Sequence, residues 1–103
     1  MGERMRIRAK RVAGVVDVKI LMSHPMETGL RQDADGNVVP ANYIEDVVAT
    51  CNGRTVLAAQ WGASVSKNPY LAFRFRNAAK GDQLVVTWTD TAGDSRTDEV
   101  VIA

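Results

Sequence analysis

The sequence predicts an all-β protein, an antiparallel immunoglobulin-like β-sandwich of about seven strands. Three observations lead to this prediction. Short segments alternate between apolar and polar residues with a period of two, turn-forming residues separate these segments, and none of them has the periodicity of an amphipathic helix. The Cys-Trp-Cys core of antibody domains is absent because the chain has a single cysteine, Cys51, so only the architecture is predicted.

The first two predicted strands lie in the first quarter of the chain. Residues 4–10 alternate basic and apolar side chains, which predicts a strand with one cationic face. Gly14 ends this strand. Residues 16–23 follow and form the most regular alternating segment of the sequence, in which Leu21 points to the outer face.

A short hairpin is predicted next. Residues 30–32 and 37–39 flank an acidic turn at residues 33–36, where Gly36 can adopt the positive φ that such a turn requires, and Pro40 ends the hairpin. The acidic turn also has a faint likeness to a calcium loop. A hairpin turn is the better interpretation, because an EF-hand needs Gly at the sixth position and Glu at the twelfth, and these positions hold other residues.

The second half of the chain repeats the pattern. Asn52-Gly53 is a preferred two-residue hairpin turn, and residues 61–69 form an irregular crossover. The predicted strands are residues 44–51, 55–60, 71–76 and 84–89, with a last strand that ends at residues 100–102.

Composition limits the classes of function. A chain of 103 residues forms one domain, residues 1–103, and its apolar fraction of 46% is that of a globular protein. The formal net charge of +1 argues against nucleic-acid and membrane partners, and the basic row at residues 4–10 is better explained as protection of an edge strand. The first six residues lack the apolar core of a signal peptide, which by itself suggests a cytoplasmic protein.

The residues with reactive side chains do not assemble into a catalytic or metal site in sequence. One histidine, one cysteine and scattered carboxylates make a poor set of metal ligands, so a metalloenzyme that uses His24 and Glu27 is a remote alternative, and no cofactor is expected. Cys51 is expected to pack as a structural residue. His24 lies where a strand stops and an exposed loop begins, and Pro25, Met26 and a flexible Gly29 suit such a loop to docking.

The segment His24-Pro25-Met26-Glu27-Thr28-Gly29 resembles the loop that follows the second strand in SoxZ proteins. The resemblance continues through residues 33–40, the Asn52-Gly53 turn, Asn68-Pro69-Tyr70-Leu71 and residues 87–90 with Gly93, and so covers nearly the whole chain. A stand-alone β-sandwich that binds a partner outside sulfur metabolism is the alternative.

The resemblance implies a non-catalytic subunit of the sulfur carrier of bacterial thiosulfate oxidation. Such a subunit binds SoxY, whose flexible tail carries the thiol, and helps to present that thiol to the Sox enzymes. It works in the periplasm and would be exported together with a signal-bearing SoxY. The residues expected to contact these partners are His24, Pro25, Met26, Glu27, Thr28, Gly29, Asn68, Pro69, Tyr70 and Leu21.

Overall fold

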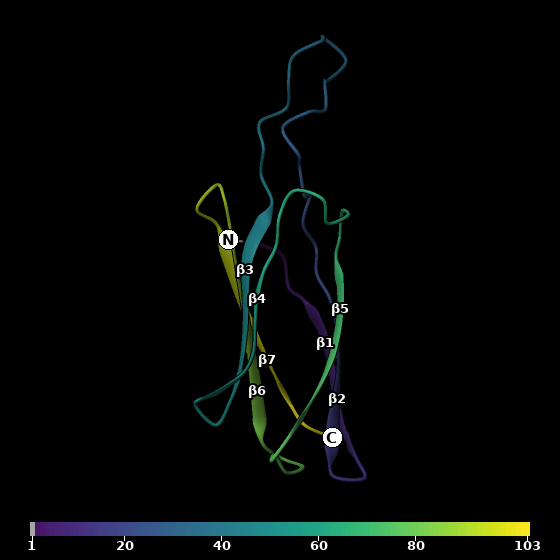
Figure 1. Ribbon diagram of the computed structural model, residues 1–103, viewed down its shortest axis with the longest axis vertical. Helices are drawn as coiled ribbons and strands as arrows, with labels where there is room; N and C mark the ends of the chain where they lie inside the picture. The colour runs from purple at the N-terminus through teal and green to yellow at the C-terminus, as the bar shows by residue number, and fades with distance from the viewer. Residues whose placement is uncertain (1) are drawn as a thin grey trace.

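The computed structural model describes residues 2–103 and forms two antiparallel sheets packed face to face (Figure 1). A three-stranded sheet has the order β1-β2-β5, and a four-stranded sheet has the order β4-β3-β6-β7. This confirms the predicted seven-stranded sandwich. The strands are β1 (Arg6–Val12), β2 (Val15–Leu21), β3 (Ile44–Cys51), β4 (Arg54–Gln60), β5 (Tyr70–Arg76), β6 (Gln83–Asp90) and β7 (Ser95–Val101).

The period-two pattern decides which side chains enter the core. On β2, Val16, Val18 and Ile20 are fully buried, while Lys19 and Leu21 are exposed. The same rule holds on β6, where alternate residues from Leu84 to Asp90 are buried. A shift of one residue in register would place every one of these apolar side chains in water, so burial fixes the register of both central strands.

The Asn52-Gly53 turn has the predicted conformation. Asn52 and Gly53 both have positive φ, 52° and 76°, as a two-residue hairpin turn of the preferred hand requires. The turn joins β3 and β4 directly. The acidic turn at residues 33–36 closes with hydrogen bonds between Asp33 and Asn37, but the flanking segments share a single bridge, Gln32↔Val38. They are therefore not strands, which differs from the predicted hairpin.

Residues 23–43 project beyond one end of the sandwich as a long arm (Figure 1). The molecule measures 53 × 21 × 20 Å because of this projection. The arm narrows at the bridge Glu27↔Asn42, and beyond it nearly every residue is exposed, Leu30 to 86%. The arm places the His24 segment at its base, between the two sheets.

The two long sides of the sandwich differ. On one side β1 and β7 contact each other, and the backbone of Ala103 hydrogen bonds with Ala9 and Arg11 of β1. On the other side lie the free edges of β4 and β5. There the guanidinium group of Arg54 donates to the carbonyl oxygens of Arg76 and Asn77. Half-buried apolar residues border this open side: Leu57, Ala59, Trp61, Val65, Leu71 and Phe73.

Candidate functional site

His24 is buried at the base of the arm, with 4% of its surface exposed. Its Nε2 atom lies 2.9 Å from Oδ2 of Asp90 at the end of β6, and its Nδ1 atom accepts a hydrogen bond from the backbone N–H of Met26 at 3.0 Å. Because Nδ1 is an acceptor, the proton of the neutral ring is on Nε2, which donates to the carboxylate. Both ring nitrogens are therefore used within the protein.

Trp88 supports the imidazole from the core. The two rings meet edge to face, with centroids 5.1 Å apart and planes at 88°. This is a favoured arrangement of aromatic rings. Gly2 covers the indole on another side, where a Cβ atom would come within 2.2 Å of the ring. The ring of His24 is thus held by packing as well as by hydrogen bonds.

Asp90 links the site to the turn between β6 and β7. Its Oδ1 atom accepts hydrogen bonds from the backbone N–H groups of Ala92 and Asp94, at 3.0 and 2.8 Å. Its other oxygen is left for His24. The Asp90 side chain is 2% exposed, and three donors surround its carboxylate, so hydrogen bonds compensate for its burial. Sequence reasoning noticed Asp90 within a family segment but did not assign it to the site.

Met26 has an unusual backbone for a bulky residue, with φ of 49°. Its side chain is buried, 5% exposed, and its Sδ atom lies 3.4 Å from the backbone N of Ile44. The thioether therefore fixes the base of the arm to the start of β3. The expected exposed loop is wrong for His24 and Met26, because both side chains turn inward and satisfy core contacts.

The second predicted segment lies directly beside the first. The backbone N of His24 donates to Oδ1 of Asn68 at 3.0 Å, and the backbone N of Asn68 donates to the carbonyl oxygen of His24 at 2.9 Å. The carbonyl oxygen of Pro69, itself buried, accepts from the N–H of Met22. Tyr70 pairs in register with Leu21, and both side chains are exposed, 62% and 43%.

Glu27, Thr28 and Gly29 begin the outer part of the arm. The Glu27 carboxylate pairs with the guanidinium group of Arg31 at 2.7 Å, and these hydrogen bonds lower the pKa of Glu27. The Thr28 hydroxyl accepts from the N–H of Leu30. Pro25 and Thr28 are exposed, while Glu27 and Gly29 are half-buried. Together with Leu21, Asn68 and Tyr70, these residues form the accessible part of the predicted set.

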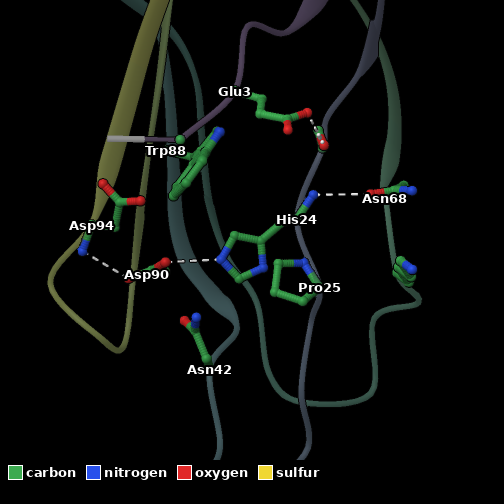
Figure 2. A pocket seen from close by; sticks show the side chains of 11 residues that line it. Glu3, His24, Pro25, Asn42, Asn68, Trp88, Asp90 and Asp94 are labelled. Carbon is green, nitrogen blue, oxygen red and sulfur yellow. Dashed lines mark hydrogen bonds and ion pairs between the residues drawn. The ribbon is translucent and has the colours of Figure 1, made fainter.

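A shallow pocket of about 480 Å³ opens beside His24 and Asp90 (Figure 2). Its wall includes two buried polar atoms that have no hydrogen-bond partner among residues 2–103, Nε1 of Trp88 and Oδ1 of Asn42. The remaining lining residues are Gly2, Glu3, Ser23, Pro25, Lys67, Asn68 and Asp94.

The single histidine and the single cysteine lie far apart. Cys51 is 2% exposed at the far end of β3, roughly 23 Å of strand from Ile44, and burial raises the pKa of its thiol. Residues 2–103 contain no group of three or more His, Cys, Asp or Glu side chains that could hold a metal ion. Within the same residues, no helix could cross a membrane. The His24–Asp90 pair is a structural link in this arrangement.

Comparison with solved structures shows the fold. A crystal structure of superoxide reductase in the oxidized state is 17% identical, with a TM-score of 0.63, and the match covers 96% of this chain and 86% of that chain. Hypothetical protein PH1083 from Pyrococcus horikoshii OT3 is also 17% identical, with a TM-score of 0.64, and the match covers 98% and 88%. At this identity the likeness concerns the fold alone.

No curated protein sequence matches this chain. The family comparison is decisive instead, because the model of the sulphur oxidation protein SoxZ matches residues 5–101, nearly the whole chain. The match includes both segments that meet at the base of the arm, and Asp90. This protein belongs to the SoxZ family of sulfur oxidation proteins.

Proposed function

We propose that this chain is the scaffold subunit of the SoxYZ sulfur carrier: it binds SoxY and helps to present the SoxY carrier cysteine to the Sox enzymes. The family match over residues 5–101 carries the proposal. The family implies a role in sulfur oxidation within a protein complex, as a subunit without catalysis. The rigid sandwich with an arm at one end suits a platform on which loops are displayed.

The chemistry of Cys51 supports a division of labour between two chains. A carrier thiol must be exposed and must form a thiolate that can reach several enzymes. Cys51 is buried, and its raised pKa lowers the thiolate fraction. In the proposed complex the sulfur is therefore attached to SoxY, and this chain supplies recognition.

The edge of β4 is the best candidate for the stable contact with SoxY. Of the four edge strands, β1, β5 and β7 each carry two or more charged residues, and β1 is also covered by Ala103. Along β4 the single charge is Arg54 at its first residue, and the strand has no proline. An edge with no proline and no charge beyond its first residue invites pairing with another chain, and the half-buried apolar side chains beside it would be covered by the same contact.

The base of the arm and the segment beside it form the surface proposed for the Sox enzymes. Pro25, Glu27, Thr28, Asn68 and Tyr70 are its accessible side chains. His24, Met26 and Pro69 lie behind them and fix their backbone. Leu21, which pairs in register with Tyr70, remains a proposed contact with a partner. We also propose that the complex works in the periplasm after export together with a signal-bearing SoxY.

Coexpression with SoxY and size-exclusion chromatography with light scattering test the proposal. We expect a complex of one chain of each protein. Ala58→Lys on the β4 edge should weaken it at least tenfold, whereas Thr89→Lys, an equally exposed position on the central strand β6, should leave it intact. If no complex forms, the chain is a binding module with another partner. If both variants bind as the parent does, the β4 edge is not the contact.

Thr28→Ala, Glu27→Ala and Tyr70→Ala test the enzyme-facing surface, because all three side chains are accessible. We expect at least one of them to slow thiosulfate turnover by the reconstituted system while the SoxY complex still forms. Unchanged turnover and complex formation in all three variants would refute the assignment of this surface.

A further inference from the structure

The outer face of the three-stranded sheet has an unusual concentration of positive charge. The registers of β1 with β2 and of β2 with β5 place four rows of side chains on this face. We call it the basic face. Its rows are Arg6-Leu21-Tyr70, Arg8-Lys19-Ala72, Lys10-Asp17-Arg74 and Val12-Val15-Arg76.

The charge of the basic face is far from that of the whole protein. Six basic side chains and one acidic side chain give it a formal charge of +5, so the rest of the chain, at a total of +1, carries −4. All six basic residues are exposed. Asp17 lies 3.8 Å from Arg74, and no ion pair joins the other five to a carboxylate within residues 2–103.

This arrangement is unfavourable for folding alone. Arg8 stands directly opposite Lys19 across the β1–β2 pair, and like charges at such positions destabilise a sheet. Protection of an edge explains charges on β1, but Lys19 lies on β2, the central strand of this sheet, which has no free edge. The charge on the central strand therefore calls for a different explanation.

Exposed apolar side chains and a hollow lie at each end of the basic face, and only the hollow at the Val12 end has a mainly apolar lining. At one end Leu21 lines a hollow of about 420 Å³ together with Arg6, and Tyr70 stands beside Leu21. At the other end Val12 and Val15 line a hollow of about 370 Å³. Arginine and tyrosine beside exposed apolar side chains and small hollows are typical of protein interfaces, in which such hollows accept side chains of the partner.

We propose that the basic face is a docking surface for an acidic protein that meets the carrier transiently. A protein fits better than a nucleic acid, because the exposed apolar side chains Leu21 and Val12 at the two ends would gain nothing from contact with phosphates. The middle rows also hold no aromatic side chain for stacking on bases. A transient contact fits better than the stable one, because the cores of stable interfaces are depleted in charge. The long-range field of the face speeds encounter with an acidic partner.

The inference rests on the proposed function in one respect, namely that the Sox enzymes bind the carrier transiently. Its test measures association rates of the SoxY complex, and of the chain alone, with each purified enzyme that conjugates, hydrolyses or oxidises the carrier-bound sulfur. Salt is varied from about 20 to about 300 mM. The variants are Arg8→Glu and Lys19→Glu. Lys80→Glu is the matched control, because it makes the same change in net charge at an exposed position in the turn after β5.

For at least one enzyme we expect Arg8→Glu and Lys19→Glu to lower the association rate constant about tenfold at low salt and to weaken its salt dependence. Lys80→Glu should change it less than twofold. All three variants should keep the SoxY complex and the fold, as chromatography and circular dichroism report. Failure of the parent chain to bind SoxY refutes the proposed function only, because the rates with the chain alone still test the basic face.

Three outcomes would overturn the inference. In the first, every enzyme associates with the basic-face variants as fast as with Lys80→Glu. In the second, the basic-face variants lose SoxY, which would make this face the stable interface. In the third, the parent chain binds duplex DNA or phosphatidylglycerol vesicles at physiological salt through Arg8 and Lys19, while the enzyme rates do not depend on these residues.

Discussion

Nε2 of His24 donates to Oδ2 of Asp90 at 2.9 Å, across 66 residues of sequence. Side-chain exposures of 3% and 2% make this a buried link between the two sheets. It joins the base of the arm to the end of β6. The SoxZ-type His24 segment therefore has its shape because of a carboxylate on the other sheet.

Loss of either partner should destabilise the protein strongly. We expect His24→Ala and Asp90→Ala each to lower the free energy of unfolding by about 3 kcal/mol, because each leaves a buried polar group without its partner. In urea denaturation, the double variant should lose less free energy of unfolding than the two single variants lose together, and the difference, the coupling energy, should be about 2 kcal/mol. The partly exposed pair Glu27–Arg31 is the control, with an expected coupling below about 0.5 kcal/mol. Equal coupling in the two pairs would contradict the structural role of His24.

Gly29 should be intolerant of a side chain. Its φ is 87°, and a Cβ atom would lie 3.1 Å from Cβ of Ala41. We expect Gly29→Ala to cost about 1 kcal/mol locally, which corresponds to about fivefold faster amide exchange at Glu27 and Asn42, whose backbones bond each other. Gly62→Ala is the control, because its φ is not positive and its Cβ would be in open space. Unchanged exchange in Gly29→Ala would show that the arm adjusts freely.

Asp98 should make the free energy of unfolding depend on pH in the acid range. Hydrogen bonds from Arg96 lower its pKa, and a hydrogen bond from the backbone N of Met5 adds to the effect. The folded protein therefore keeps this carboxylate charged at pH values at which the unfolded chain binds a proton. The stabilisation is present above about pH 4 and is lost as the pH falls through the folded pKa. Asp98→Asn should flatten this part of the stability profile, measured by urea denaturation from neutral to acid pH. An identical acid profile for parent and variant would be inconsistent with this role.

Cys51 should be unreactive in the folded protein. Because burial raises its pKa and blocks access, we expect labelling by a thiol reagent at neutral pH to be at least about a hundredfold slower in buffer than in denaturant. Cys51→Ala should leave thiosulfate turnover unchanged. Rapid labelling of the native protein would reopen a chemical role for this residue.

The strands and turns could be predicted because their signals are local. Alternation on β2 and β6 and the Asn52-Gly53 turn each depend on neighbouring residues, and the structure has them as expected. The predicted pairing at residues 30–32 and 37–39 reduced to one bridge, since an isolated two-stranded arm has no sheet or core to pack against.

The interior of the site could not be predicted, because its contacts are distant in sequence. The burial of His24 depends on Asp90 and Trp88, and the inward turn of Met26 depends on a left-handed backbone that no local pattern favours. The hydrogen bonds between His24 and Asn68 likewise join residues that are 44 positions apart in the sequence. Sequence thus singled out two segments that the structure places side by side, but not which of their side chains face inward.

Native mass spectrometry of the chain with SoxY after incubation with thiosulfate and the Sox enzymes tests the central claim most directly. The account predicts a complex of one chain of each protein, with a sulfur adduct on the SoxY cysteine and none on Cys51. An unmodified chain without SoxY bound, or an adduct on Cys51, would contradict it.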